Sequence, residues 1–200
     1  MNDQTFSLQP FPSTKSLPNL KIAGNIIRIY NQLDICYMLK GDLKEIALAY
    51  PYGEASYAQR LVEKPTVGIA PPSNTRSRKH ELWEDTCFEL FVGIKDSAQY
   101  WEFNLSPAGH WNVYRFDSYR QGMQEETAFT ILPFNVQNQA DGLALAFDVD
   151  LNKIVSPVQE IEVAITTVIK HRDGEVTYWA LTHRGAEADF HLRDSFIVEL

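Results

Sequence analysis

Hydrophobic and polar residues alternate along most of this chain, and a period of two predicts β-strands. The predicted strands lie at 25–30, 33–40, 44–49, 87–92, 100–105, 144–150, 160–169 and 176–181. Few windows show the spacing of a helix, and turn-forming residues recur at short intervals. The predicted fold class is therefore all-β: an antiparallel two-sheet β-sandwich of the immunoglobulin-like or jelly-roll-like kind.

The length of the chain bounds its organisation. Its 200 residues are enough for one well-buried core, so a single β-sandwich domain is predicted over 21–200. The first twenty residues carry Pro10, Pro12 and Pro18, and they are predicted to form an extended N-terminal arm along the domain edge. Regular structure is expected to begin after this arm.

Loops and turns separate the predicted strands. The segment 52–81 is rich in proline and ends in a basic cluster, so it is predicted to be a long functional or mobile loop. Asp141-Gly142 and Asp173-Gly174 predict tight turns, the second of them within a hairpin. A helical turn is expected near 55–62 or 150–155.

Polar residues occupy strand interiors in the middle of the chain, at Glu89, Glu102 and Asn104. Side chains alternate across a strand, so Tyr100, Glu102 and Asn104 share one face. If the two strands pair through their short connection, Glu89 and Phe91 join that face, with facing Cβ atoms roughly 4.5 to 5.5 Å apart. A face that combines carboxylates, an amide and aromatic rings predicts a ligand site. A merely solvated sheet face is the alternative.

The aromatic residues indicate what kind of ligand such a face would take. The candidates are Trp83, Trp101, Trp111, Trp179, Tyr114 and Tyr119. Indole rings stack on the apolar faces of sugar rings, while carboxylates and amides hold hydroxyls, so a carbohydrate or similar polyol is favoured. Trp101 alternates with the polar face and is expected in the core.

The two glutamates also raise the alternative of an enzyme. Glu89 and Glu102 would serve as acid and base of a glycosidase if their carboxyls lay roughly 5 Å or roughly 6.5 to 9.5 Å apart. Other catalytic motifs, such as a Gly-x-Ser-x-Gly elbow or a glycine-rich phosphate loop, do not occur. A non-catalytic binding role is therefore preferred, and catalysis stays open.

Charge and composition exclude several partners. Acidic residues outnumber basic ones by 26 to 18, and no run of Lys or Arg could follow a phosphate backbone, so nucleic acid is not expected. No apolar run approaches the roughly 18 residues of a membrane helix, and no signal peptide is seen, so a cytoplasmic protein without a membrane partner is predicted. Cys36 and Cys87 lie within apolar strands and are predicted to be buried free thiols, not metal ligands.

Four motifs together resemble a known family. They are 86–91 (TCFELF), 100–107 (YWEFNLSP), 109–111 (GHW) and the closing 188–192 (ADFHL). They resemble the DOMON-like β-sandwich domains related to family 9 carbohydrate-binding modules, in particular a stand-alone bacterial group, over about 26–200. The resemblance implies a β-sandwich, and members of the wider superfamily bind sugars or haem.

Two further side chains have two readings each. Arg78 is expected to pair with Glu89 or Glu102, which would fix the long loop over the sheet or make a purely structural buried ion pair. His191 either bonds to Asp189 or to backbone, or faces the site as a donor to the ligand.

The resulting prediction is a non-catalytic module that binds a saccharide or small polyol. Its predicted ligand-binding residues are Arg78, Trp83, Glu89, Glu102, Asn104, Trp111, Asp189 and His191. The alternatives are a glycoside-processing enzyme, a self-associating β-sandwich that forms a homodimer, and a haem-binding domain. No cofactor is predicted, with calcium or haem as the alternatives.

Overall fold

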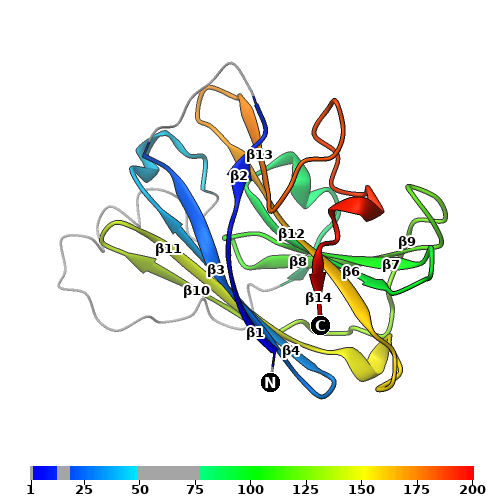
Figure 1. Ribbon diagram of the computed structural model, residues 1–200. Coiled ribbons are helices and arrows are strands. Elements are labelled where there is room, and N and C mark those ends of the chain that lie inside the picture. Colours follow the sequence, from blue (N-terminus) through cyan, green and yellow to red (C-terminus); the bar gives the residue numbers. More distant parts are fainter. Residues whose placement is uncertain (1, 13–18, 49–76) are drawn as a thin grey trace.

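The computed structural model describes residues 2–12, 19–48 and 77–200, which form two facing β-sheets (Figure 1). The first sheet has the order β1 (Asn2–Ser7), β3 (Lys21–Ile29), β4 (Gln32–Lys40), β11 (Gly142–Asp150), β10 (Phe134–Gln139). The second has the order β2 (Gln9–Pro10), β13 (Val176–Ala180), β12 (Ile161–Lys170), β6 (Cys87–Ile94), β7 (Tyr100–Leu105), β8 (His110–Phe116), β5 (Ser77–Arg78). β14 (Val198–Glu199) lies beside β12, and β9 (Gln124–Glu125) lies beside β8.

All described strand pairs are antiparallel except the short pair of β5 and β8. Four 3₁₀ turns occur in the described chain: η1 (Leu43–Glu45), η3 (Leu82–Glu84), η4 (Leu151–Lys153) and η5 (Arg193–Ser195). The predicted antiparallel two-sheet β-sandwich is confirmed. No helix in the described residues has the length and hydrophobicity needed to cross a membrane.

The main core lies between the sheets and takes one face of each strand. Tyr37 of the first sheet packs edge-on against Phe88 of the second, with ring centroids 5.3 Å apart. The Tyr37 hydroxyl donates a 2.6 Å hydrogen bond to the backbone carbonyl of Glu89 and so ties the sheets together. Trp101 is buried in this core, as predicted from its alternation.

The N-terminal segment joins both sheets. β1 pairs with β3 at one edge of the first sheet, and β2 pairs with β13 at one edge of the second. Figure 1 shows this dark-blue segment running from one sheet to the other. The segment is extended and lies along sheet edges, but regular structure begins at Asn2 and not after residue 20, because edge strands offer unpaired backbone groups to it.

Most predicted strands are confirmed, including the hairpin of β12 and β13. The strand predicted at 44–49 is wrong as far as it is described. The Asp42 carboxylate accepts a hydrogen bond from the backbone N–H of Lys44 and caps η1, and Ile46 makes only an isolated bridge to His171. A helical turn near 150–155 is confirmed as η4. Residues 49–76, with most of the long loop predicted at 52–81 and the turn at 55–62, lie outside the described residues.

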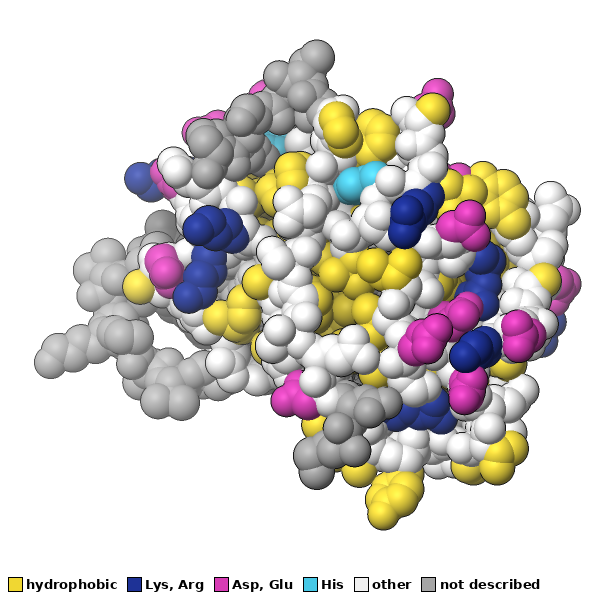
Figure 2. Space-filling view, in the orientation of Figure 1, with side chains coloured by type: hydrophobic (Ala, Val, Ile, Leu, Met, Phe, Trp, Pro, Cys, Tyr) yellow, Lys and Arg dark blue, Asp and Glu magenta, His cyan; other side chains and the backbone are white. Residues whose placement is uncertain are grey.

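The outer face of the second sheet carries an apolar cluster of its own. Its members are Leu82, Cys87, Phe91, Tyr100, Tyr114, Phe116, Ala164, Val168, Ala180, Phe190 and Phe196. Every residue of β7 is buried, so the solvated sheet face considered from sequence is wrong. Side chains of both charge signs are interspersed on the surface shown in Figure 2. Both cysteines are free: Cys87 is buried as predicted, whereas Cys36 is only half-buried.

Candidate functional site

A row of polar side chains crosses the outer face of the second sheet. Thr166 of β12 faces Glu89 of β6, which faces Asn104 of β7, which faces Asn112 of β8. All four are buried. The pairing of β6 with β7 confirms that the polar faces of the two strands coincide, and it places Glu102 beside this row.

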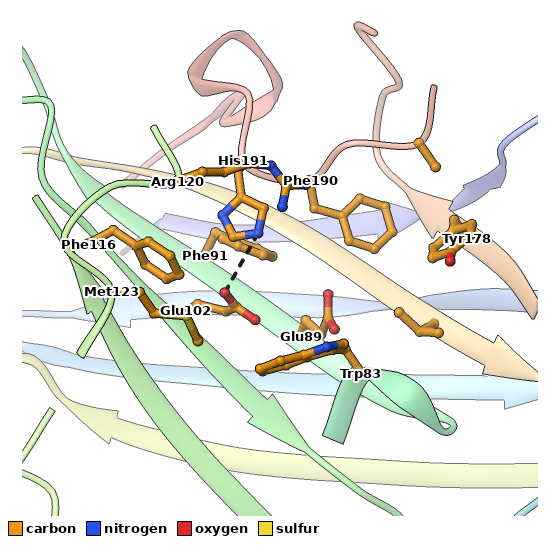
Figure 3. A pocket seen from close by; sticks show the side chains of 12 residues that line it. Trp83, Glu89, Phe91, Glu102, Phe116, Arg120, Met123, Tyr178, Phe190 and His191 are labelled. Carbon is orange, nitrogen blue, oxygen red and sulfur yellow. Dashed lines mark ion pairs between the residues drawn. The ribbon is translucent and has the colours of Figure 1, made fainter. Parts of the chain in front are cut away.

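A cavity of about 400 Å³ opens over this face. Its walls are formed by Trp83, Glu89, Phe91, Glu102, Phe116, Arg120, Met123, Val168, Tyr178, Ala188, Phe190 and His191. Figure 3 shows the carboxyl groups of Glu89 and Glu102 side by side, with Trp83 on one side of them and His191 on the other. The cavity therefore combines a mainly aromatic wall with two acidic groups.

Neutral side chains hold the two buried carboxyl groups, and Glu89 also interacts with the Cys87 thiol. The Thr166 hydroxyl donates to Glu89 Oε2 at 3.0 Å, and Asn104 Nδ2 donates to Glu102 Oε1 at 2.7 Å. Glu89 and Glu102 are only 2% and 4% exposed, and no Lys or Arg of the described residues forms an ion pair with either. Two buried carboxyls without a cation are costly to ionise.

The protonation of this pair follows from its burial. Desolvation raises the pKa of Glu102 to about 7. Desolvation, followed by repulsion from Glu102, raises the pKa of Glu89 well above its ordinary value. Burial therefore favours the protonated form of both carboxyl groups, and Glu102 is close to half-ionised at neutral pH.

His191 reaches the cavity from the C-terminal segment. Its Nδ1 lies 2.8 Å from the Tyr100 hydroxyl, and its Nε2 lies 3.9 Å from Glu102 Oε2. The Tyr100 hydroxyl accepts the backbone N–H of Arg120 at 3.2 Å and can donate its own proton to Nδ1, while Nε2 faces the acceptor Glu102 Oε2. This arrangement favours the tautomer with the imidazole proton on Nε2. Burial, aided by the charge of Arg120, lowers the pKa of His191 to about 4, so the ring is neutral at neutral pH.

The two interpretations of His191 were a bond to Asp189 or to backbone, and a position facing the site. The structure places the imidazole ring at the cavity. Its bond to Asp189 is made by backbone: the His191 N–H donates to Asp189 Oδ1 at 3.0 Å. Asp189 also accepts the hydroxyl of Tyr119 at 2.5 Å and Arg120 Nη2 at 2.9 Å. Asp189 thus neutralises the half-exposed Arg120 at the rim and fixes the backbone that carries His191.

Arg193 anchors the same C-terminal segment to the second sheet. Its Nη2 donates to the backbone carbonyl of Ile94 at 3.1 Å and to Glu162 Oε2 at 2.9 Å, and its guanidinium lies over Phe196. The guanidinium also lies directly on Gly93, where a Cβ atom would come within 1.6 Å of Nη1. Glycine at this position is what lets the arginine side chain approach the sheet.

Gly93→Ala is expected to displace the Arg193 side chain and lower the free energy of unfolding by about 1 kcal/mol. The measurement is urea unfolding of the four proteins of a double-mutant cycle: the parent, Gly93→Ala, Arg193→Ala and the double variant. In the Arg193→Ala background the added methyl group should cost far less, because nothing then occupies its place. An equal cost in both backgrounds would contradict this assignment.

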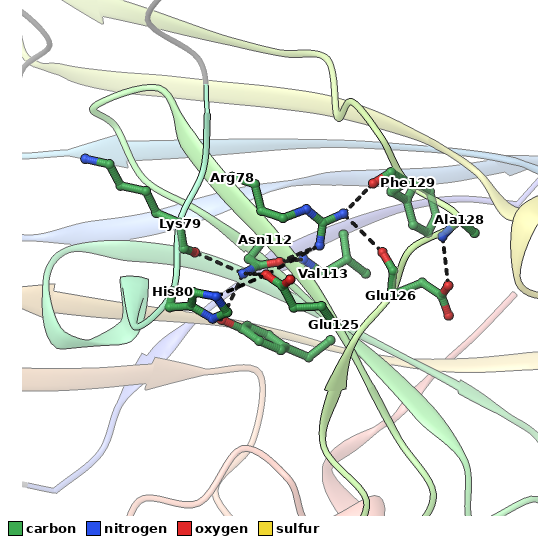
Figure 4. Close-up of polar contacts among 10 residues, drawn as sticks. Arg78, Lys79, His80, Asn112, Val113, Glu125, Glu126, Ala128 and Phe129 are labelled. Atoms are coloured by element: carbon green, nitrogen blue, oxygen red, sulfur yellow. Dashed lines mark hydrogen bonds and ion pairs between the residues drawn. The ribbon is translucent and has the colours of Figure 1, made fainter.

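Arg78 lies at the far edge of the second sheet and not in the cavity (Figure 4). Its Nη1 donates to Asn112 Oδ1 at 2.7 Å, and its Nη2 donates to the backbone carbonyls of Glu126 and Phe129. The expected pairing with Glu89 or Glu102 is wrong, because β5 pairs with β8 and leaves Arg78 beyond the strands that carry those glutamates.

Trp111 also lies away from the cavity. It is buried in the core between the sheets, on the face of β8 opposite to Asn112, and its ring lies 4.5 Å from the Arg78 guanidinium carbon. Asn104 does not line the cavity, but its side-chain amide donates a hydrogen bond to Glu102, which does. Of the predicted ligand-binding residues, Trp83, Glu89, Glu102 and His191 line the cavity. Their role in binding stays a prediction.

Sequence reasoning missed several residues of the cavity wall. They are Phe116, Arg120, Met123, Val168, Tyr178, Ala188 and Phe190. Alternation could have placed Tyr178 on the outer face, because its neighbour Trp179 belongs to the core. Phe190 precedes His191 in the closing motif, whereas Arg120 and Met123 come from a segment without hydrophobic pattern and gave no signal.

Within 2–12, 19–48 and 77–200, no three or more His, Cys, Asp or Glu side chains are grouped so that they could hold a metal ion. Met123 lines the cavity, and His110 contacts Ser77 at the sheet edge. Binding of calcium or haem stays a prediction.

The comparisons with known proteins concern the fold. No protein-family model matches the chain, and no curated protein matches its sequence. A candidate carbohydrate-binding protein from Bacteroides uniformis has a similar structure, with a TM-score of 0.63 at 12% identity over 96% of this chain and 84% of that one. A family 9 carbohydrate-binding module from Caldicellulosiruptor kristjanssonii, in complex with glucose, gives a TM-score of 0.49 at 9% identity over 93% and 78%. The first likeness shows that the chain shares the β-sandwich fold of the Bacteroides protein.

Proposed function

We propose that this protein is a non-catalytic module that binds a small saccharide or polyol in the cavity on the outer face of its second sheet. The observation that carries the proposal is the cavity itself. It has a volume of about 400 Å³, aromatic rings form much of its wall, and the carboxyl groups of Glu89 and Glu102, although nearly inaccessible to solvent, line it. Specific sites for small ligands commonly have this volume and this mixture of apolar wall and few polar groups.

The polar atoms of the cavity suit hydroxyl groups. His191 Nε2–H is a donor, and Glu102 Oε2 is an acceptor 3.9 Å away from it. A hydroxyl between them accepts from the imidazole and donates to the carboxyl group. The neighbouring Glu89, whose pKa is raised by burial, adds a further donor when protonated or acceptor when ionised. Trp83 supplies an indole on which a sugar ring can stack.

Trp83→Ala is expected to weaken saccharide binding about tenfold, because it removes the stacking surface while the carboxyl groups remain. Isothermal titration calorimetry with a panel of monosaccharides and disaccharides measures this change. Tyr30→Ala is the matched control, since Tyr30 is an aromatic residue that is 92% exposed and does not line the cavity. Failure of the parent protein to bind any saccharide at millimolar concentration would refute the proposal, and equal binding by Trp83→Ala would place the ligand elsewhere.

A glycoside-processing enzyme is the second candidate, and one observation favours it. Glu102 has a pKa of about 7 and lies in the cavity near a second carboxyl group, as a general acid and base require. Incubation with aryl glycosides between about pH 5 and pH 8 separates the two candidates. Turnover that Glu102→Gln abolishes would establish the enzyme, whereas binding without turnover supports the module.

A further inference from the structure

We infer that the ligand of this cavity carries a protonated amine, which the site places against Glu89 and Glu102. The chemical class is an amino sugar or an amino polyol. The inference rests on the proposed saccharide-binding function and names the substrate class for it.

The first step is the charge of the cavity. Glu89 and Glu102 are buried with no Lys or Arg partner in the described chain. Among the described residues that line the cavity, Arg120 is the one Lys or Arg, and it is already paired with Asp189 at 2.9 Å. A pair of buried carboxyls is normally matched by a cation, because each charge loses its hydration. Arg120 acts on Glu102 only at a distance, and no Lys or Arg of the described residues forms an ion pair with either carboxyl group, so a cationic ligand would complete the pair.

The second step is the inventory of hydrogen bonds. The carboxyl group of Glu89 accepts from Thr166 and interacts with the Cys87 thiol, and that of Glu102 accepts from Asn104. Glu102 Oε2 has no hydrogen bond among the described residues, although it belongs to a side chain that is 4% exposed and lines the cavity. An ammonium group has donors only and no acceptor, so it matches carboxylate oxygens better than a hydroxyl does.

The third step is the aromatic wall. Trp83, Phe91 and Phe116 line the cavity together with the two glutamates. Aromatic rings attract cations through their negative faces, and cages of such rings are known to hold ammonium groups. The rings and carboxyls therefore favour the same charge. An anionic sugar would instead meet two acidic groups, with Arg120 already engaged by Asp189.

Binding of an amine is linked to the ionisation of Glu102. The titratable and charged groups around it are Glu89 and Cys87 on β6, Tyr100 on its own strand, Tyr114 on β8, Arg120 in the loop after β8, and His191 in the C-terminal segment. Burial raises the pKa of the Cys87 thiol, so the thiol adds no charge. His191 is neutral at neutral pH, and the two tyrosines keep their protons. An ammonium group that docks below pH 7 should thus expel the proton of Glu102.

The test is calorimetry of the full-length protein with glucose, glucosamine, N-acetylglucosamine and glucuronate at about pH 6.5, where the amine is protonated. Glucosamine is expected to bind about tenfold more tightly than glucose or N-acetylglucosamine. Repeating the titration in buffers of different ionisation enthalpy should reveal release of protons with glucosamine and not with glucose. Putrescine, an amine without a sugar ring, serves as the fifth probe.

Glu102→Gln should abolish the preference for glucosamine, so that glucose and glucosamine bind this variant with similar affinity. Glu199→Gln is the control, because Glu199 is an exposed glutamate on β14 that does not line the cavity. Circular dichroism checks that both variants fold. Equal binding of glucose and glucosamine, or tighter binding of glucuronate, would overturn the inference and leave the proposed function standing. Binding of putrescine without any saccharide would keep the amine site and refute the saccharide module, and binding of no probe would refute both.

Discussion

Asn112→Ala is expected to lower the free energy of unfolding by about 3 kcal/mol. Asn112 is fully buried, and its Oδ1 accepts Arg78 Nη1 at 2.7 Å and the backbone N–H of Val113 at 2.8 Å. Its Nδ2 donates to the backbone carbonyl of Lys79 at 3.1 Å and to Glu125 Oε1 at 2.8 Å. One side chain thus joins β5, β8 and β9 (Figure 4). Alanine at this position would remove the hydrogen bonds that these partners make to Asn112, and buried polar groups without hydrogen bonds destabilise the folded state.

Urea unfolding monitored by tryptophan fluorescence measures this loss. Asn138→Ala is the matched control, since Asn138 lies on the edge strand β10 and is exposed, so its replacement should change stability by less than about 0.5 kcal/mol. The cavity is built by other residues, and saccharide binding by folded Asn112→Ala should stay near that of the parent. A loss no larger than that of the control would show that this hydrogen-bonded junction does not hold the sheet edge.

Glu102→Gln is expected to stabilise the protein above neutral pH, on the order of 2 kcal/mol near pH 8, and to change little near pH 5. Burial raises the pKa of Glu102 from 4.5 to about 7 in the folded protein. The folded state therefore holds this proton more tightly than the unfolded state does. The resulting stability is fully present below about pH 4.5 and is lost as the pH rises through about 7. Glutamine keeps the shape and the contact with Asn104 but cannot ionise.

His191 changes the stability of the protein with pH in the opposite direction, and its contribution must be separated from that of Glu102. Its pKa is lowered from 6.5 to about 4 in the folded protein, so the unfolded state binds the proton more tightly. Stability from the neutral ring is present above about pH 6.5 and is lost as the pH falls through about 4. Comparing Glu102→Gln with the parent at each pH cancels this contribution, because both proteins contain His191.

Guanidinium unfolding of the parent and Glu102→Gln at several pH values gives the difference directly. Glu199→Gln, which removes an exposed carboxyl group, should show no such trend. A constant difference between about pH 5 and pH 8 would mean that Glu102 is hydrated and ionises normally. That result would also remove the basis for proton release on binding of an amine.

Local pattern was enough to predict most of the strands. Alternation at 33–40 and 100–105 reports which side of the backbone each residue takes, and that geometry is set within the strand itself. The face shared by Glu89 and Glu102 follows because a short connection joins their strands and fixes the pairing. The strand predicted at 44–49 was wrong because Asp42 caps the 3₁₀ turn η1. This local hydrogen bond favours a turn over a strand, and the alternation of hydrophobic and polar residues gives no sign of it.

The partners in contacts between distant segments could not be predicted from the sequence. Arg78 is predicted from the sequence to pair with Glu89 or Glu102, yet β5 pairs with β8 on the side away from β7. Trp111 has the residue type of a sugar-binding side chain, but its position in β8 points it into the core. Arg120 reaches the cavity from a loop without pattern, positioned by Asp189 from a segment 69 residues away in the sequence.

The sequence by itself determined the β-sandwich class and the sharing of one sheet face by Glu89, Glu102 and Asn104. Both depend on periodicity and on neighbouring strands, which are properties of short stretches of chain. Only the tertiary structure decided that this face is covered by the C-terminal segment, and that His191 and Trp83 flank the carboxyl groups across a cavity. Those features depend on contacts between distant segments and on the burial they produce, and burial is what shifts the pKa of Glu102 toward neutrality.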